Sequence, residues 1–218
     1  MPDPNLFRLR VEFCKQGRLA LLSHLEVARA LERAVRRADL PFAVSQGFSP
    51  HMKIAFGAAL PVGVGSTCEV FDLQMTRYVP PERALAALQD ASVDDLMPHA
   101  CRYIGPRDAA ASVAYPVAAY RALLSRAPEG GLVLPAEVRV VRKKKEKVLR
   151  TADFLVSGPQ VEGAVASFEL EAKPDGSLRP DVLLRACLDA WNEAHSADGE
   201  DGPLRALSLT RVSQRAAR

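Results

Sequence analysis

The sequence predicts an α+β fold in which two units of alternating strands and helices follow one another along the chain. Residues 8–14 alternate between apolar and charged side chains, which is typical of a half-buried strand. Ser23 and Glu26 form a capping box ahead of an amphipathic helix, and Pro41 ends that helix. The 218 residues suffice for two domains of about 100 residues each.

The first unit is expected to span residues 1–104. Its further elements are expected as strands near 42–44, 53–56 and 69–75, a helix from Pro80-Pro81 to Gln89, and a strand near 97–104. Without the short strand at 42–44, the order strand, helix, strand, strand, helix, strand is the ferredoxin-like βαββαβ pattern, in which helices cover one face of an antiparallel sheet. Arg8, Arg10 and Glu12 would then lie on the uncovered face.

Residues 105–116 are small, polar and bounded by proline, so they are expected to form a linker to a second unit at 117–218. The elements expected there are a strand at 117–124, a strand at 167–172, a helix from Pro180 to about Ala194, and a strand at 204–212. The basic stretch at 134–145 is ambiguous between helix and irregular structure. We interpret this unit as a degraded second ferredoxin-like unit. Because the two halves share no visible sequence repeat, that interpretation depends on the order of the elements alone.

The composition argues against several classes of protein. The four cysteines contain no CxxC pair, which argues against a zinc ribbon or an iron–sulfur cluster held by this chain, and no cofactor is expected. No apolar run approaches the ~20 residues of a membrane span, and the first residues lack the apolar core of a secretory signal. We therefore expect a cytoplasmic protein without a membrane partner.

Small polar and basic residues concentrate between positions 23 and 57. His24 is the one polar residue on the apolar stripe of the helix, and a turn-rich segment follows the helix. Two imidazoles and an ammonium group could bind a phosphate or transfer protons. Alternatively, these side chains satisfy the backbone of a tight turn. The candidate ligand-binding residues are Ser23, His24, Ser45, Gln46, Gly47, Phe48, His51 and Lys53.

Two further basic sets are candidate contacts for RNA. The first is a helix face with Arg29, Arg33, Arg36 and Arg37, and the second comprises Arg142, Lys143, Lys144 and Lys145 within the basic segment 139–150. Both could contact phosphates, whereas the alternative is a solvated, ion-paired helix face and a solvated basic run. Aromatic residues are only 6% of the chain, so sites for base stacking are expected to be scarce. Phe48 is the one aromatic residue within the basic turn.

The same segments resemble a bacterial family known as radical SAM-linked proteins. That family has an SHLD-type helix start, an arginine-rich helix and a segment of the type SQGFxPHPK. Here these motifs read SHLE at 23–26 and SQGFSPHMK at 45–53, and the segments LPVG at 60–63 and GSLRP at 176–180 also fit. Glu26 replaces the usual aspartate and Met52 replaces a common proline.

The resemblance implies a place beside a radical SAM protein. Members of the family, described as a domain of unknown function, are encoded next to or fused behind such a protein, and sometimes near a ribonuclease of the E/G type. This chain has no CxxxCxxC motif of its own. We expect a non-catalytic accessory protein that binds RNA or presents it to a radical SAM enzyme, in tRNA or rRNA modification or processing.

Two alternatives stay open. The chain could be a metal-independent endoribonuclease similar to the CRISPR repeat-processing ribonucleases, with His24, His51 and Lys53 as catalytic residues. It could also be a protein-interaction module that docks a radical SAM protein and contacts no RNA.

Overall fold

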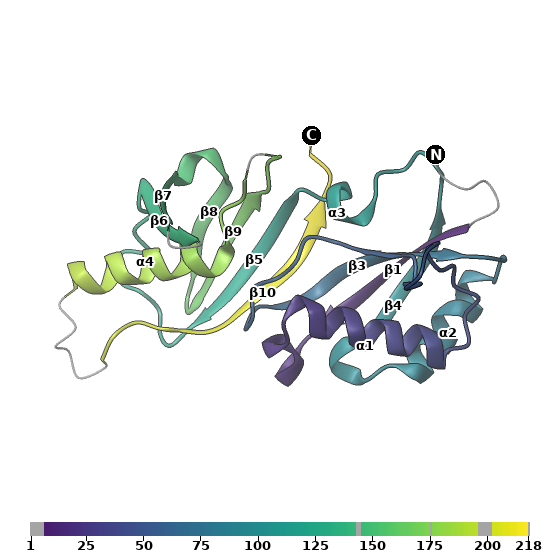
Figure 1. The fold of residues 1–218 in the computed structure, drawn as a ribbon. Coiled ribbons are helices and arrows are strands. Elements are labelled where there is room, and N and C mark those ends of the chain that lie inside the picture. Colours follow the sequence, from purple (N-terminus) through teal and green to yellow (C-terminus); the bar gives the residue numbers. More distant parts are fainter. Residues whose placement is uncertain (1–6, 143–144, 175, 196–201, 218) are drawn as a thin grey trace. The chain divides into compact units, whose positions relative to one another are not determined.

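The computed structural model describes residues 7–142, 145–174, 176–195 and 202–217, and the chain divides into two compact units (Figure 1). Unit 1 comprises Met1–Tyr115 and unit 2 comprises Pro116–Arg218. Both units combine antiparallel strands with helices. This confirms the mixed α+β class.

Unit 1 has a sheet with the strand order β4-β1-β3-β2, in which every neighbouring pair is antiparallel. Its elements are β1 (Phe7–Lys15), a 3₁₀ turn (Gly17–Leu21), α1 (His24–Arg37), β2 (Ile54–Phe56), β3 (Gly65–Met75), α2 (Pro81–Ala91), a 3₁₀ turn (Asp94–Leu96), β4 (Pro98–Ile104) and the short α3 (Ala111–Ala114). The strands expected near 42–44 and 53–56 are reduced to isolated bridges and the three-residue β2.

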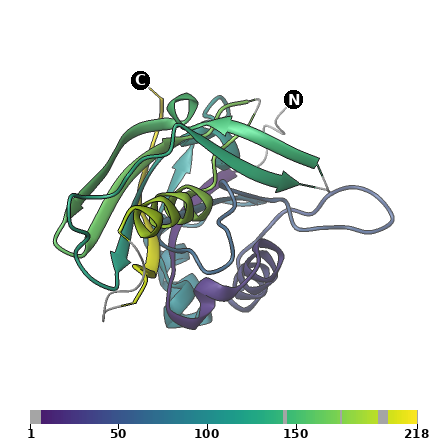
Figure 2. The same cartoon turned by 90° about the vertical axis from the view of Figure 1, so that its left-hand side faces the viewer.

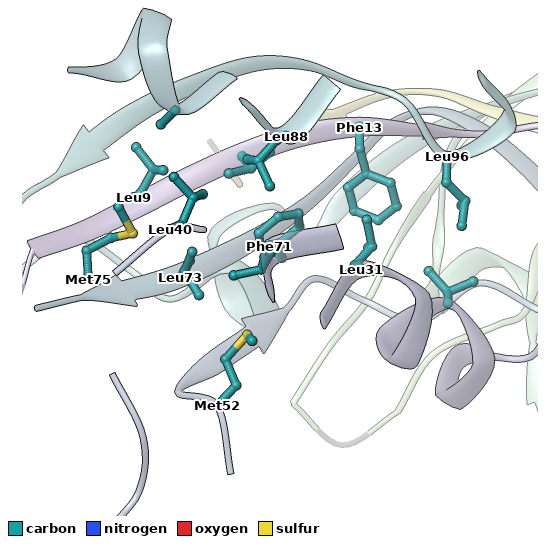
Figure 3. Packing of buried hydrophobic residues seen from close by; sticks show 14 residues of the cluster. Leu9, Phe13, Leu31, Leu40, Met52, Phe71, Leu73, Met75, Leu88 and Leu96 are labelled. Atoms are coloured by element: carbon teal, nitrogen blue, oxygen red, sulfur yellow. The ribbon is translucent and has the colours of Figure 1, made fainter. Parts of the chain in front are cut away.

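The core of unit 1 lies between this sheet and the helices α1 and α2 (Figure 3). The alternation of β1 turns Leu9, Val11 and Phe13 into the core. α1 contributes Val27, Leu31 and Val35, which lie on one face because they recur at intervals of four residues. Phe71 of β3 is fully buried, with its ring centroid 5.8 Å from that of Phe13.

The start of α1 is fixed by the predicted capping box. The Ser23 Oγ accepts a hydrogen bond from the Glu26 backbone N–H, and the Ser23 backbone N–H donates to Glu26 Oε2 over 2.8 Å. The hydrogen bond from the Ser23 side chain and then that from its backbone lower the pKa of the Glu26 carboxyl group. A lowered pKa means that folding favours the ionised carboxylate.

Replacing Ser23 with alanine should destabilise unit 1 by about 1 kcal/mol at neutral pH, because α1 loses its N-cap. The Glu26 contribution is present above its unfolded-state pKa, and it disappears as the pH falls through the lower folded-state pKa. The stability gap between the wild type and Ser23→Ala should therefore shrink in acid. Urea denaturation at pH 7 and pH 3.5 measures this gap, and an equal gap at both values would contradict the ionic contribution.

The opposite face of the unit 1 sheet differs from the prediction. Arg10 was expected in solvent, but it is 4% exposed and pairs with Asp72, which stands directly opposite on β3. Arg10 Nε lies 2.7 Å from Asp72 Oδ1 and Arg10 Nη2 lies 2.9 Å from Oδ2. The hydrogen bond that the Arg10 guanidinium donates to Asp72 raises the pKa of that guanidinium. The alternating pattern was misleading because a charged side chain can be buried when a cross-strand partner neutralises it.

Residues 105–115, expected to form a linker, cover this ion pair and belong to unit 1. The Ala109 carbonyl accepts a hydrogen bond from Arg10 Nη2 over 2.6 Å, and the Ala111 backbone N–H donates to Asp72 Oδ2 over 2.9 Å. The Tyr115 hydroxyl lies 3.3 Å from Arg10 Nη1. The segment is therefore held to the sheet by charged groups rather than being a detached tether.

Unit 2 has a sheet with the order β10-β5-β9-β8 and a separate hairpin of β6 and β7. Its elements are β5 (Val117–Leu124), β6 (Glu137–Arg142), β7 (Lys145–Arg150), a 3₁₀ turn (Thr151–Asp153), β8 (Leu155–Glu162), β9 (Val165–Glu171), α4 (Pro180–Ala194) and β10 (Ala206–Arg215). The segment 134–145, expected as helix or irregular structure, instead contains strand β6, which pairs with β7. A hairpin stands in unit 2 where unit 1 has its first helix.

Candidate functional site

The segment with the SQGFSPHMK motif forms a loop that is fixed at its base. The Ser45 backbone N–H donates to the His51 carbonyl over 2.8 Å, and the His51 backbone N–H donates to Ser45 Oγ over 3.0 Å. Below this closure, the Lys53 N–H donates to the Ala43 carbonyl, and the Lys53 carbonyl accepts from Gln74 of β3. We call residues 45–51 the motif loop; Figure 2 shows it extending away from the helices and strands of unit 1.

The tip of the motif loop is presented to solvent. Gln46, Gly47, Phe48 and His51 are all exposed, and the Phe48 ring is fully exposed. Gly47 has φ +131°, a backbone conformation that residues other than glycine rarely adopt. The loop therefore combines a backbone shape that requires glycine with an aromatic ring that has no packing role in unit 1.

His24 lies elsewhere. Contrary to its expected place on the buried stripe, it is exposed, and its ring meets the Phe56 ring edge-on at 5.6 Å between centroids. The adjoining cavity measures about 20 Å³, which is room for about one water molecule. Phe56 ends β2, whereas the motif loop joins the other end of β2 through Lys53. The structure thus divides the predicted set into two places, with Ser23 and His24 at one and the motif loop at the other.

The four arginines of α1 are exposed. Arg36 lies 3.7 Å from Glu32, an ion pair across one helical turn, and Arg37 Nη2 donates to the Ala91 carbonyl over 2.8 Å. Arg29 and Arg33 precede Arg37 at intervals of four residues, so these three follow one line along the helix. We call Arg29, Arg33, Arg36 and Arg37 the arginine face.

An apolar groove runs beside the arginine face. Its volume is about 300 Å³, and it lies between α1 and the two 3₁₀ turns of unit 1. Its lining residues are Leu19, Leu22, Ala30, Leu31, Arg33, Ala34, Arg37, Ser92, Val93 and Leu96. Leu21 and Leu25, which belong to the same turn and helix, are exposed large apolar side chains.

The second basic set is part of the β6-β7 hairpin. Arg142 ends β6 and Lys145 begins β7, while Lys143 and Lys144 lie outside the described residues. Val138 and Leu149 stand opposite each other and are buried, which anchors the hairpin in unit 2. The described residues of the basic segment, 139–142 and 145–150, therefore belong to two paired strands.

Sequence reasoning missed a cluster of aromatic residues in unit 1. The Tyr78 and Tyr103 rings are stacked, with centroids 5.0 Å apart, and Phe7 meets both edge-on at 6.0 and 6.1 Å. The three residues come from β1, the segment after β3, and β4, so no local motif marks them. The pairing of β1 with its two neighbouring strands brings the three rings together. Phe7 stands opposite Met75, which precedes Tyr78 by three residues, and Leu9 stands opposite Tyr103.

Within the described ranges, no group of three or more His, Cys, Asp or Glu side chains gathers where a metal ion could bind. The four cysteines are free thiols, and burial raises the pKa of the Cys187 thiol to about 11. No helix in the described part of the chain is long and apolar enough to cross a membrane.

The comparisons with known proteins identify a family. No curated protein matches the chain. The family model for an uncharacterized protein conserved in bacteria, DUF2344, matches residues 8–173. This match includes the arginine face, the motif loop, Tyr78 and Tyr103 of the aromatic cluster, and the β6-β7 hairpin. The chain belongs to the DUF2344 family of proteins conserved in bacteria.

Proposed function

We propose that this chain is a non-catalytic RNA-binding protein that presents tRNA or rRNA to a partner radical SAM enzyme for modification or processing. The observation that carries the proposal is the exposed arginine face. Arg29, Arg33 and Arg37 repeat about every 6 Å along the axis of α1. A row of guanidinium groups at this spacing can contact successive phosphates and bind them with two hydrogen bonds each.

The motif loop supports the same proposal. Its hydrogen-bonded base reduces the conformational entropy that binding must remove. The exposed Phe48 offers a flat ring for an unpaired base, and His51 offers an imidazole for a phosphate. Arginine face and motif loop would act as separate contacts on one extended ligand.

The strand orders support interpreting both units as ferredoxin-like. In each unit the sheet order is fourth, first, third and second strand along the chain, counting only the strands of that sheet. Helices α1 and α2 complete the βαββαβ pattern in unit 1. In unit 2, the β6-β7 hairpin takes the place of one helix, which agrees with a degraded second copy.

The radical SAM partner is proposed from the resemblance of the SHLE and SQGFSPHMK segments. The apolar groove beside α1 supports a protein contact, because Leu19 and Leu22 line it and Val93 is exposed there. Leu31 and Leu96 line the same groove, so the apolar face of an amphipathic partner helix fits its chemistry.

The positions of the histidines favour binding over ribonuclease chemistry. A general acid and a general base must reach the same phosphate, each within about 3 Å of the proton it transfers. His24 contacts Phe56, the last residue of β2, whereas His51 lies before the first residue of β2 in the motif loop. The proposal therefore assigns them to binding.

The proposal predicts that RNA affinity falls steeply with salt. If four arginines contact phosphates, raising the salt from 50 to 200 mM should weaken binding about 50-fold. Fluorescence anisotropy with labelled tRNA and rRNA fragments measures this dependence. If the protein does not bind RNA, or if salt does not change its affinity for RNA, the proposed RNA binding is contradicted. Loss of co-purification with the radical SAM protein after nuclease treatment would contradict the direct protein contact.

A further inference from the structure

We propose that Phe7, Tyr78 and Tyr103 form a stacking site for one base of single-stranded RNA, with Arg77 and Arg83 contacting the adjoining phosphates. We call the three rings the aromatic platform. This inference deepens the proposed RNA-binding function and rests on it. It adds a second place for an unpaired base, formed by residues of unit 1 that lie outside the motif loop.

The exposure of the rings is the first argument. Tyr78 is 56% exposed although its ring stacks on Tyr103, and Phe7 is 41% exposed. Large aromatic side chains that cluster on a surface instead of in the core mark binding sites more often than single exposed residues do. Because Tyr103 supports Tyr78 from behind, the exposed part of the Tyr78 ring can receive a further planar group.

The orientation of Tyr78 is fixed by its neighbours. The Tyr103 hydroxyl donates to the Val79 carbonyl over 2.9 Å and accepts from the Val79 backbone N–H over 3.1 Å. Burial raises the pKa of the Tyr103 hydroxyl, so it remains a donor at neutral pH. Pro80 and Pro81 follow and restrict the backbone. A ring held in this way loses little conformational entropy when a base stacks on it.

A cavity adjoins the platform. It measures about 510 Å³, lies between the end of α1 and the start of α2, and includes Tyr78, Arg77, Arg83 and Asp39 in its lining. This volume is in the range of cavities that hold small organic ligands. Arg77 and Arg83 are both exposed, so their guanidinium groups can approach a phosphate without the cost of burying an unpaired charge.

The charges distinguish RNA from the main competing ligand. Proline-rich peptides also bind grooves lined by tyrosine. Two arginines against one aspartate in the lining leave a net positive charge, which favours a phosphate-bearing ligand. A base stacked on Tyr78 would place its sugar and phosphates beside the ring. Arg77 and Arg83 line the same cavity as Tyr78, so they can reach these phosphates.

The test compares two labelled RNA decamers, an oligoadenylate and an abasic ribose-phosphate decamer, by fluorescence anisotropy with the full chain. The abasic decamer retains the phosphates and lacks the bases. Wild type should bind the oligoadenylate about tenfold more tightly than the abasic decamer. Tyr78→Leu should lower this preference several-fold and leave the abasic affinity unchanged, because Phe48 remains as a separate ring, whereas Tyr78→Phe, which keeps the ring, should retain the full preference. Thermal melts establish that all three proteins are folded.

Equal wild-type affinity for the two decamers, an undiminished preference in Tyr78→Leu, or binding only of a proline-rich peptide would each overturn the inference. The proposed function is judged separately, with structured tRNA. Salt-sensitive tRNA binding without a decamer preference would leave the proposed function standing and refute the platform. A decamer preference without tRNA binding would support the platform and refute the proposed function.

Discussion

Replacing Asp72 with alanine should lower the free energy of unfolding of unit 1 by about 3–5 kcal/mol. The side chains of Asp72 and Arg10 are each 4% exposed, and two hydrogen bonds join them. Removing the carboxylate leaves the Arg10 guanidinium buried beside only neutral acceptors. It also removes the acceptor of the Ala111 backbone N–H and the partner of Arg8, so residues 105–115 should lose their attachment as well.

Urea denaturation of the wild type and Asp72→Ala measures this effect. The matched control is Asp153→Ala, which breaks the exposed ion pair between Asp153 and Arg150 and should cost less than 1 kcal/mol. The double variant Arg10→Met, Asp72→Leu should recover much of the loss, because it removes both charges together. A cost for Asp72→Ala no larger than that of the control would refute the structural role of the pair.

Changing all four residues of the arginine face to glutamine should weaken RNA binding about 100-fold at 100 mM salt. Each lost phosphate contact also lowers the salt dependence, so the slope of log affinity against log salt should become shallower by about 3. Glutamine has a helix propensity close to that of arginine, so α1 should stay folded. Circular dichroism checks the helix, and anisotropy measures both affinity and slope.

A charge-matched control separates local contacts from the effect of net charge. Arg107, Arg121, Arg185 and Arg205 are exposed and lie outside the arginine face. Their replacement by glutamine changes the formal charge by the same amount, and it should weaken binding only several-fold. Equal losses in the two variants would mean that RNA binding depends on overall charge, which would count against the arginine face.

Local sequence signals predicted the parts of the fold that local interactions determine. Ser23 and Glu26 marked the start of α1 because their hydrogen bonds join residues three positions apart. The apolar repeat of Val27, Leu31 and Val35 identified the buried side of the helix. His24 continues the same side of the helix three residues before Val27, yet it is exposed, because the first turn of a helix can extend beyond the surface that covers the rest.

Features that depend on pairing between distant residues were not visible in the sequence. Arg10 and Asp72 are cross-strand neighbours separated by 62 positions, so the alternation of β1 alone suggested an exposed face. The aromatic platform likewise unites Phe7, Tyr78 and Tyr103 only once the register of β1, β3 and β4 is set. The sequence did not predict the β6-β7 hairpin, because its many charged residues weaken the alternation of apolar and polar side chains that marks a strand.

The most direct test of the central claim is ultraviolet crosslinking in living bacteria that express the wild type or the four-arginine variant. RNA covalently attached to the purified protein is sequenced, and the crosslinked peptides are identified by mass spectrometry. The RNA-binding account predicts enriched tRNA or rRNA fragments with the wild type, crosslinks on peptides that contain Phe48 or Tyr78, and a strong decrease with the variant. RNA recovery from the wild type no greater than from a non-binding control protein would contradict it.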